Sequence, residues 1–275
     1  MNEGSEENAP SNAAEYFGGE VKALREALGL SQTEFAKELK YTQAQVSKVE
    51  TGQVLASETF AEAMDAVAKT PGVYARLRAR LSKQGHPEWF VPYINLEEAA
   101  SGITDYSCTF LMGLLQTPEY ATAVFRAAHP RASAETIKES VDTRLLRRVV
   151  MERQDPPLLW VVIHEAVLRA EIGGRAVMAA QLEHLIVQSE SPHVTLQVLP
   201  FKAGAAPSHL PFTLLSKGGN PSTVYTETPT HGGQVDDSES VVGNAVAMLD
   251  RLRAVSASEA DSRVLMRTIM EEHSR

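Results

Sequence analysis

A short segment beginning at residue 43 carries side chains that can read the edges of nucleic-acid bases. Successive residues of an α-helix are about 100° apart, so a helix here would gather on one face Gln43, Ala44, Ser47 and Lys48. Glutamine can pair with adenine through two hydrogen bonds, lysine can reach the acceptors of guanine, and alanine can contact the methyl group of thymine. Because polar outer faces are common on helices, the meaning of this pattern depends on the elements that position it.

Two helix starts lie close together around this segment. Ser31 with Glu34, and Thr42 with Gln45, have the spacing of a capping box, in which the hydroxyl and the third side chain each satisfy a backbone N–H group of the first turn. Between the two predicted helices, only residues 39–41 remain to turn the chain. The sequence therefore predicts a helix, a tight turn and a second helix that presents its outer face.

This helix pair belongs to a predicted domain of five short helices at residues 15–84, the first of them at about 17–28 with Gly29 as its C-cap. Its inward faces are predicted to carry Val21, Leu24, Leu28, Phe35, Ala36, Leu39, Val46, Val49, Phe60, Met64 and Val67. Residues 1–14 lack hydrophobic periodicity and are expected to form a disordered tail. The formal net charge of −9 argues against a protein that coats nucleic acid indiscriminately, but it does not exclude a localised reader.

The stretch from residue 31 to residue 53 resembles the phage-repressor and Cro-like (XRE) family of helix-turn-helix regulators. The family pattern appears here as Ser31-Gln32, Ala36, Val46-Ser47 and Glu50-Thr51-Gly52. The resemblance implies that three side chains face bases, namely Gln43, Ala44 and Lys48. It also implies that Gln32 bonds a phosphate and that three further residues lie near the DNA backbone, namely Gln45, Ser47 and Thr51.

One position departs from that family, which usually has glycine in the turn after its second helix, where this chain has Lys40. A left-handed conformation costs a residue other than glycine roughly 1 kcal/mol. We expect Lys40 to offset this by touching a phosphate, or the turn to differ. Because the reading helix carries one cation, we expect a homodimer on paired half-sites of an operator duplex. The alternative is a helical bundle that kept the fold and lost DNA binding.

The rest of the chain, residues 86–275, predicts a separate α+β domain after the break at "KQGHPEW". Helical spacing is found at about residues 95–105, 117–128, 134–153, 175–190 and 238–253. Short strand-like runs are "PLLWVVIH", "TLQVLP", "FTLLS" and "STVYTE". Ser256 with Glu259 predicts the capping box of a final helix at about 257–272. The fold class is therefore multidomain, with an all-α five-helix domain followed by an α+β domain.

Acid–base or metal chemistry in this second domain would have to use His164 and Glu165, His184, His193, His209, His231, or the pair Asp236-Asp237. None of these has the spacing of a known catalytic or metal-binding motif. His164 is more simply a hydrogen-bonded residue at a strand end, and Asp236-Asp237-Ser238 a helix N-terminus, where acids favour the helix dipole. We predict no enzyme activity, no cofactor and no metal.

The second domain resembles, over nearly its whole length, the large domain that follows XRE domains in actinobacterial regulators of the WhiJ type. The segments that carry the likeness include "WFVPYINLEEAASGI", "GLLQTPEYATAVFRA" and "PPLLWVVIHEAVLRAEIGG", with Met112 where the family commonly has proline. The resemblance implies an antitoxin-like domain that meets a small protein encoded by a neighbouring gene. The segment Leu114–Thr117 is most simply a packed turn that enters a helix at Pro118, with Thr117 as the N-cap. The alternative is that it also lines a partner surface, which would comprise Gly113, Leu114, Leu115, Gln116, Thr117, Tyr120, Phe212 and Tyr225.

The sequence is compatible with three functions. The first is a sequence-specific transcriptional regulator whose second domain senses a small partner protein or ligand. The second is an antitoxin-like interaction protein in which DNA binding is secondary, and the third is an enzyme tethered to DNA. The chain has no apolar run long enough to span a membrane, lacks the features of a signal peptide, and has one cysteine, Cys108. We expect a cytoplasmic protein that joins the nucleoid when bound to DNA.

Overall fold

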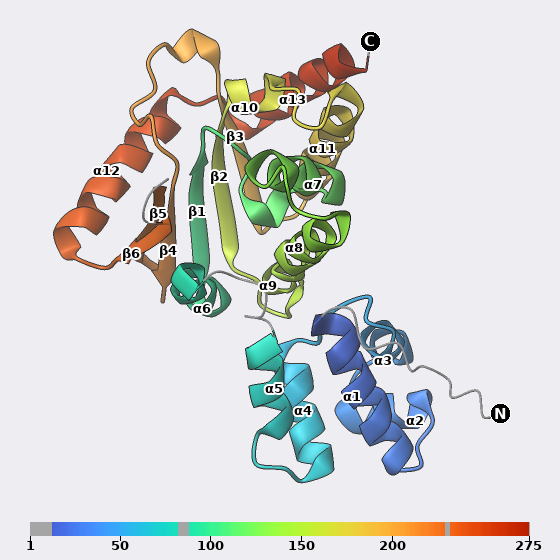
Figure 1. The fold of residues 1–275 in the computed structure, drawn as a ribbon. Helices are drawn as coiled ribbons and strands as arrows, with labels where there is room; N and C mark the ends of the chain where they lie inside the picture. The colour runs from blue at the N-terminus through green and yellow to red at the C-terminus, as the bar shows by residue number, and fades with distance from the viewer. Residues whose placement is uncertain (1–12, 82–87, 229–231, 275) are drawn as a thin grey trace. The chain divides into compact units, whose positions relative to one another are not determined.

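The structure is a computed structural model that describes residues 13–81, 88–228 and 232–274 (Figure 1). The chain divides into two compact units, Met1–Gly85 and His86–Arg275. The predicted disordered tail lies outside the described residues, apart from Ala13 and Ala14, which are helical. The predicted domain break near "KQGHPEW" falls largely on residues 82–87, which also lie outside them.

Five α-helices make up the described part of the first unit: α1 (Ala13–Ala27), α2 (Gln32–Leu39), α3 (Gln43–Glu50), α4 (Glu58–Ala68) and α5 (Val73–Leu81). The prediction of inward faces is confirmed for α2, α3 and most of α4, which bury Phe35, Ala36, Leu39, Val46, Val49, Phe60 and Met64. It is wrong for Leu28, which is 43% exposed because α1 ends one residue before it. Helix α1 buries Val21, as predicted, and also Phe17, whereas Leu24 is half-buried.

The described part of the second unit contains one mixed six-stranded sheet with the order β3-β2-β1-β4-β5-β6. The strands are β1 (Gly102–Ser107), β2 (Leu158–His164), β3 (Val194–Leu199), β4 (Phe212–Lys217), β5 (Asn220–Thr228) and β6 (Gly232–Asp236). Strands β1, β2 and β3 run parallel, whereas β4 pairs with β1 antiparallel and continues into an antiparallel meander. The sheet therefore changes from parallel to antiparallel between β1 and β4.

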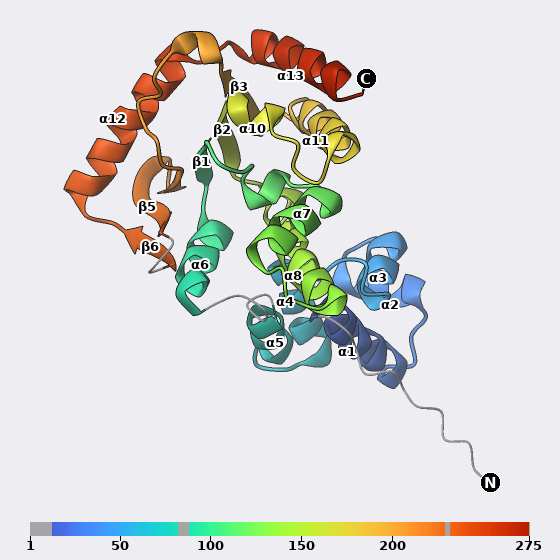
Figure 2. The same ribbon diagram turned by 45° about the horizontal axis from the view of Figure 1, so that its top comes forward.

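Helices cover both faces of this sheet, as Figures 1 and 2 show. Helix α12 (Glu239–Val255) lies on one face, over a core that includes Tyr106, Val162 and Phe212. The opposite face carries the larger core, shared by α6 (Val91–Ala99), α7 (Pro118–Ala128), α10 (Glu165–Arg169), α11 (Arg175–Gln188) and α13 (Glu259–His273). The two parallel connections run through α7, α8 (Ala134–Leu146) and α9 (Val149–Glu152), and through α10 and α11. Short 3-10 helices are η1 (Glu88–Phe90), η2 (Gly113–Leu115) and η3 (Phe201–Ala203).

The predicted α+β fold class is confirmed, and four details are wrong. The helix predicted at 95–105 ends at Ala99, and its second half is the central strand β1. Strand β6 was not predicted, because two glycines and mostly exposed residues give it no apolar pattern. The helix predicted at 134–153 is divided into α8 and α9. Ser258, and not Ser256, caps α13, by accepting a hydrogen bond from the Asp261 backbone N–H.

Candidate nucleic-acid interface

Both predicted capping boxes of the helix pair are confirmed. The Ser31 hydroxyl accepts from the Glu34 backbone N–H at 3.3 Å, and the Glu34 carboxylate accepts from the Ser31 N–H at 2.9 Å. Thr42 and Gln45 repeat the arrangement at 3.2 and 2.9 Å. The hydrogen bond from the Ser31 side chain lowers the pKa of Glu34, so the cap favours its charged form. The start of each helix is therefore fixed by residues within its own first turn.

Of the two alternatives left open for the turn between α2 and α3, the structure shows the left-handed one. Lys40 has φ 62° and ψ 39°, and it is exposed. Its N–H donates to the Lys37 carbonyl at 3.1 Å, and the Tyr41 N–H donates to the Ala36 carbonyl at 2.9 Å, which closes the end of α2. The Tyr41 ring packs edge-on against Phe60, with 4.9 Å between the ring centroids. This contact with α4 holds the turn against the core.

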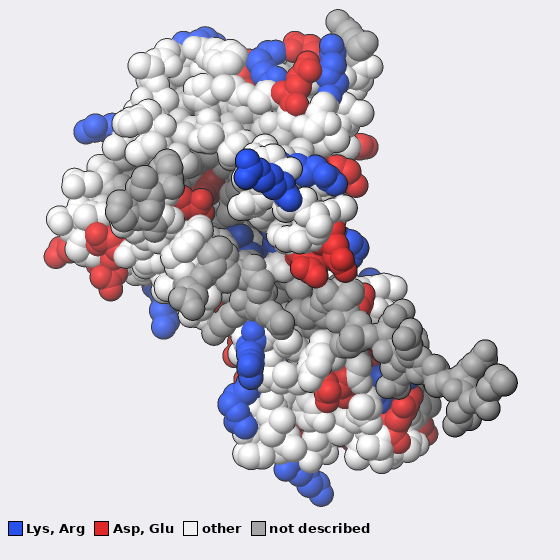
Figure 3. Space-filling model, viewed as in Figure 1, with Lys and Arg blue, Asp and Glu red and all other residues white. Residues whose placement is uncertain are grey.

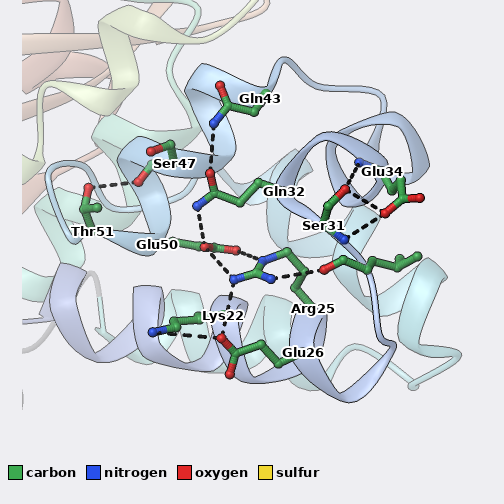
Figure 4. Close-up of polar contacts among 11 residues, drawn as sticks. Lys22, Arg25, Glu26, Ser31, Gln32, Glu34, Gln43, Ser47, Glu50 and Thr51 are labelled. Carbon is green, nitrogen blue, oxygen red and sulfur yellow. Dashed lines mark hydrogen bonds and ion pairs between the residues drawn. The ribbon is translucent and has the colours of Figure 1, made fainter.

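A chain of hydrogen bonds runs from the first helix to the outer face of α3 (Figure 4). The Arg25 guanidinium donates to both carboxylate oxygens of Glu50, at 2.6 and 3.2 Å. Gln32 Nε2 donates to the same carboxylate at 2.8 Å, and Gln43 Nε2 donates to Gln32 Oε1 at 2.8 Å. The Arg25 and Glu50 side chains are only 13% and 4% exposed, and the hydrogen bond to Glu50 raises the pKa of Arg25. A shielded ion pair thus orients two amides toward the surface.

This network leaves Gln43 with the groups that adenine requires. An amide nitrogen carries two hydrogens, and one of those on Gln43 is engaged by Gln32. The second hydrogen and Oε1 make no hydrogen bond to any residue that the structure describes. One donor and one acceptor on an exposed glutamine match N7 and N6 of adenine in the major groove.

The other residues predicted to bind DNA differ in exposure and in whether their polar groups are already hydrogen-bonded within the protein. Ala44 and Lys48 are exposed on α3, and Ser47 is half-buried. Gln45 has its Oε1 engaged by Thr42, which leaves Nε2 to donate. Thr51 donates its hydroxyl to the Ser47 and Lys48 carbonyls at 2.8 and 3.2 Å, so it caps the end of α3. Thr51 therefore has no hydroxyl hydrogen left to donate to a phosphate, and the contacts of all these residues with DNA stay predictions.

The close approach of α1 and α3 is not predicted from the sequence. A Cβ atom at Gly18 would lie 2.4 Å from the Val49 carbonyl oxygen, and one at Gly52 would lie 2.7 Å from Glu15 Cγ. Gly52 also has φ 70°. These glycines let the helix that carries Arg25 lie against the end of α3, where Glu50 is. The signal was the Gly18-Gly19 pair inside a helical pattern, which weakens a helix unless packing requires it.

The residues predicted to form a partner surface are mostly buried. Apart from the half-buried Gly113, each of the eight is at most 9% exposed. Phe212 belongs to the core under α12, whereas Tyr225 belongs to the core on the opposite face of the sheet. The structure therefore does not bring these residues to one exposed surface. The predicted helix N-cap at Thr117 is confirmed, since its hydroxyl accepts from the Tyr120 N–H.

The acid–base candidates do not converge on one site in the described residues. His164 ends strand β2, as predicted, and its Nδ1 accepts from the Ala166 N–H at 3.1 Å. Asp236 accepts from the Ser238 N–H at 2.8 Å next to the start of α12. His231 lies outside the described residues. Within the described ranges, no group of three or more His, Cys, Asp or Glu side chains could hold a metal ion, and no helix is long and apolar enough to cross a membrane.

Comparison with protein families gives two matches. Residues 90–268, well over half of the chain, match the family described as a domain of unknown function, DUF5753. The chain belongs to the DUF5753 family. Residues 17–81 of this DUF5753 protein match a helix-turn-helix domain, which indicates a DNA-binding regulator. No curated protein and no solved structure matches the chain.

Proposed function

We propose that this DUF5753 protein is a sequence-specific transcriptional regulator of the XRE type that reads an operator with α3. In this proposal Gln43, Ala44 and Lys48 contact base edges. The phosphate backbone is contacted by Gln32, Lys40, Gln45, Ser47 and Thr51. The observation that carries the proposal is the hydrogen-bonded chain from Arg25 through Glu50 and Gln32 to Gln43. Restricting the conformation of a surface glutamine brings no benefit unless that side chain binds a ligand. A side chain that reads a base gains specificity when hydrogen bonds hold it in the binding conformation.

The cations near the reading face favour a dimer. Helix α3 carries Lys48, and the preceding turn carries Lys40, against a formal net charge of −9 for the chain. Each bound phosphate contributes to affinity mainly through counterion release, so one domain with few cations binds weakly. Two copies on paired half-sites would multiply the effect and supply the specificity of a palindromic operator. The dimer is therefore part of the proposal.

The second unit is proposed to control the first in response to a small partner protein or a ligand. Its resemblance to the WhiJ type supports this role, and it is much the larger of the two units. An effector can change operator affinity only if it binds the DNA-competent arrangement and the incompetent one unequally. A preference of about 2 kcal/mol would change operator affinity roughly thirtyfold.

The proposal is tested by selecting duplexes from a randomised pool with the full-length protein. We expect one sequence, with inverted half-sites, to be enriched and to bind at least about a thousandfold more tightly than random duplex at the same salt. Sedimentation of the protein with this duplex should show two copies per duplex. If no sequence is enriched, or if the enriched duplex binds no better than random DNA, this function is wrong.

A further inference from the structure

A line of polar side chains crosses the face of the sheet that carries the larger core. Asp105 on β1 lies opposite Thr213 on β4, and Thr213 lies opposite Tyr225 on β5. The Asp105 carboxylate accepts from the Thr213 hydroxyl at 2.8 Å and from the Ser107 hydroxyl. Asp105 is 6% exposed, so a strand in the middle of the sheet buries a carboxylate. This line lies where the sheet changes from parallel to antiparallel pairing.

Two arginines at the C-terminal end of α8 supply positive charge to the same region: Arg144 lies in the last turn of the helix, and Arg147 is its C-cap residue. Arg147 donates to both oxygens of Glu97 on α6, at 2.9 and 2.7 Å, and these two side chains are 9% and 1% exposed. A Cβ atom at Gly113 would lie 3.0 Å from Arg147 Nη1, so the glycine gives the guanidinium its space. Arg147 therefore has its counter-ion inside the protein.

Arg144 has no such acid partner. Its Nη1 donates to Gln116 Oε1 at 2.8 Å, and its guanidinium lies over the Phe125 ring, 3.9 Å from the centroid. In the described part of the chain, no carboxylate forms a hydrogen bond or ion pair with it. Burial, together with the charge of Arg147, lowers the pKa of Arg144 to about 10. A partly buried cation without a counter-ion is unfavourable for folding, and its remaining N–H groups suit an anionic group from outside.

Negative charge faces the same space from the strands. Burial raises the pKa of Asp105 to about 6. The Glu227 carboxylate accepts from the Tyr225 hydroxyl at 2.7 Å, and its charge raises the pKa of both Asp105 and Arg144. Through Tyr225, which lies opposite Thr213, Glu227 continues the line of polar side chains that begins at Asp105. The carboxylates would repel a purely anionic ligand, and the arginines would repel a purely cationic one.

Figure 3 shows that the surface is hollowed between the strands and the helices α7 and α8, with acidic and basic side chains inside the hollow. We propose that this hollow binds a small zwitterion of the amino-acid class, with its carboxylate on Arg144 and its ammonium group facing Asp105 and Glu227. The "GLLQ" segment then positions the two arginines of the site, since Gly113 leaves space for Arg147 and Gln116 accepts a hydrogen bond from Arg144. This inference names the ligand class of the sensing step, and in that respect it rests on the proposed function.

The experiment is differential scanning calorimetry of the full-length protein, without DNA, in the presence of each of the twenty free amino acids. Succinate and putrescine serve as probes with one sign of charge. We expect at least one amino acid to raise the melting midpoint of the second unit by on the order of 5 °C at about a hundredfold excess over its Kd. No shift with any amino acid, or an equal shift with succinate or putrescine, contradicts the proposal. Because DNA is left out, this result is independent of whether the first unit binds an operator.

Three variants locate the site, with affinity measured by titration calorimetry using the best amino acid. Arg144→Gln should weaken binding at least tenfold, whereas Arg126→Gln, an exposed arginine on α7, should leave it unchanged. Tyr225→Phe keeps the ring that packs 4.1 Å from Tyr93 and removes the hydroxyl that holds Glu227, so it should weaken binding severalfold. Unchanged affinity in Arg144→Gln, or equal losses in Arg144→Gln and Arg126→Gln, overturns the assignment.

Discussion

The shielded charged side chains of the two units differ in where their hydrogen bonds lead. In the first unit, the ion pair of Arg25 and Glu50 ends a chain of hydrogen bonds that reaches the surface at Gln43. In the second unit, Arg147, Glu97 and Asp105 face inward, and their hydrogen bonds end on other shielded groups. The first arrangement positions a side chain for a large external partner. The second is a polar interior, which suits a small ligand that can enter it.

The largest effect is expected when the inward pair of the second unit is broken. Glu97→Gln leaves the Arg147 charge shielded and unpaired, so the free energy of unfolding should fall by about 3–5 kcal/mol. Urea unfolding followed by tryptophan fluorescence measures this, because both tryptophans of the chain, Trp89 and Trp160, belong to the second unit. The exposed Glu139→Gln is the control on α8.

Combining Glu97→Gln with Arg147→Met should recover most of that loss, because an uncharged pair has no desolvation penalty. A loss below about 1 kcal/mol in Glu97→Gln alone would show that the pair is not shielded as the structure indicates, and the contrast between the two units would fail.

A somewhat smaller effect is expected at Asp105, and its sign depends on pH. Its pKa of about 6 lies above the ordinary value of 3.8, so the folded state is stabilised relative to the unfolded state below pH 4 and loses that advantage as pH rises through 6. Asp105→Asn should therefore stabilise the protein by about 3 kcal/mol at pH 8, because each unit of pKa corresponds to about 1.4 kcal/mol. At pH 3.5 we expect little difference. Urea unfolding of both proteins at the two pH values measures this difference. An equal change in the free energy of unfolding at pH 3.5 and pH 8 would contradict a buried carboxylate that is ionised at pH 8.

The contact between α1 and α3 predicts a smaller loss in the first unit. Gly18→Ala puts a Cβ atom 2.4 Å from the Val49 carbonyl oxygen, so the helices must separate, at a cost of about 1–3 kcal/mol. Gly19→Ala meets nothing within 4 Å and should stabilise α1 by about 0.5–1 kcal/mol. Thermal unfolding followed by circular dichroism compares the two. Equal effects of the two substitutions would mean that this close approach does not fix α3.

Replacing the two lysines in the left-handed region is expected to have the smallest effect on stability. The two substitutions should differ in their effect on DNA binding. Lys40 and Lys69 have φ 62° and 54°, so glycine at either position should stabilise the first unit by up to about 1 kcal/mol. Lys40→Gly should also weaken binding to cognate and random DNA alike, with a salt slope lower by about 1, because it removes a phosphate contact. Lys69→Gly should leave DNA binding unchanged. Equal salt slopes for both variants would remove Lys40 from the interface.

Much of the first unit could be predicted from the sequence because its determinants are local. Capping boxes join residues three positions apart, so Ser31 with Glu34 and Thr42 with Gln45 are visible in the sequence, and both form in the structure. The left-handed turn at Lys40 is suggested only by the family resemblance, which leaves open whether the turn differs, and the structure shows the left-handed conformation. The support of Gln43 by Arg25 is not visible in the sequence, because it depends on how α1 packs against α3, where Arg25 meets Glu50, 25 residues away in the chain.

The second unit was predicted less well because its polar residues are explained by long-range packing. Strand β1 has Asp105 and Ser107 among its buried residues, which removes the apolar run typical of a central strand. The segment Gly113–Tyr120 is predicted to line a partner surface, although most of its side chains are buried. Gln116 accepts a hydrogen bond from Arg144, 28 residues away in the chain. Met112 illustrates the same limit: its N–H, which proline would lack, donates to Ser107. Only the folded structure shows these partners.

The most direct test of the account is the affinity of Gln43→Ala for cognate and random duplexes at one fixed salt concentration. We expect a loss of about 1–3 kcal/mol in binding free energy on the cognate duplex and almost none on random DNA, because Gln43 reads a base. Gln53→Ala, an exposed glutamine just beyond α3, should change neither affinity. Equal losses on cognate and random DNA, or no loss on either, would contradict the assignment of α3 as the reading helix with Gln43 held in place by Gln32.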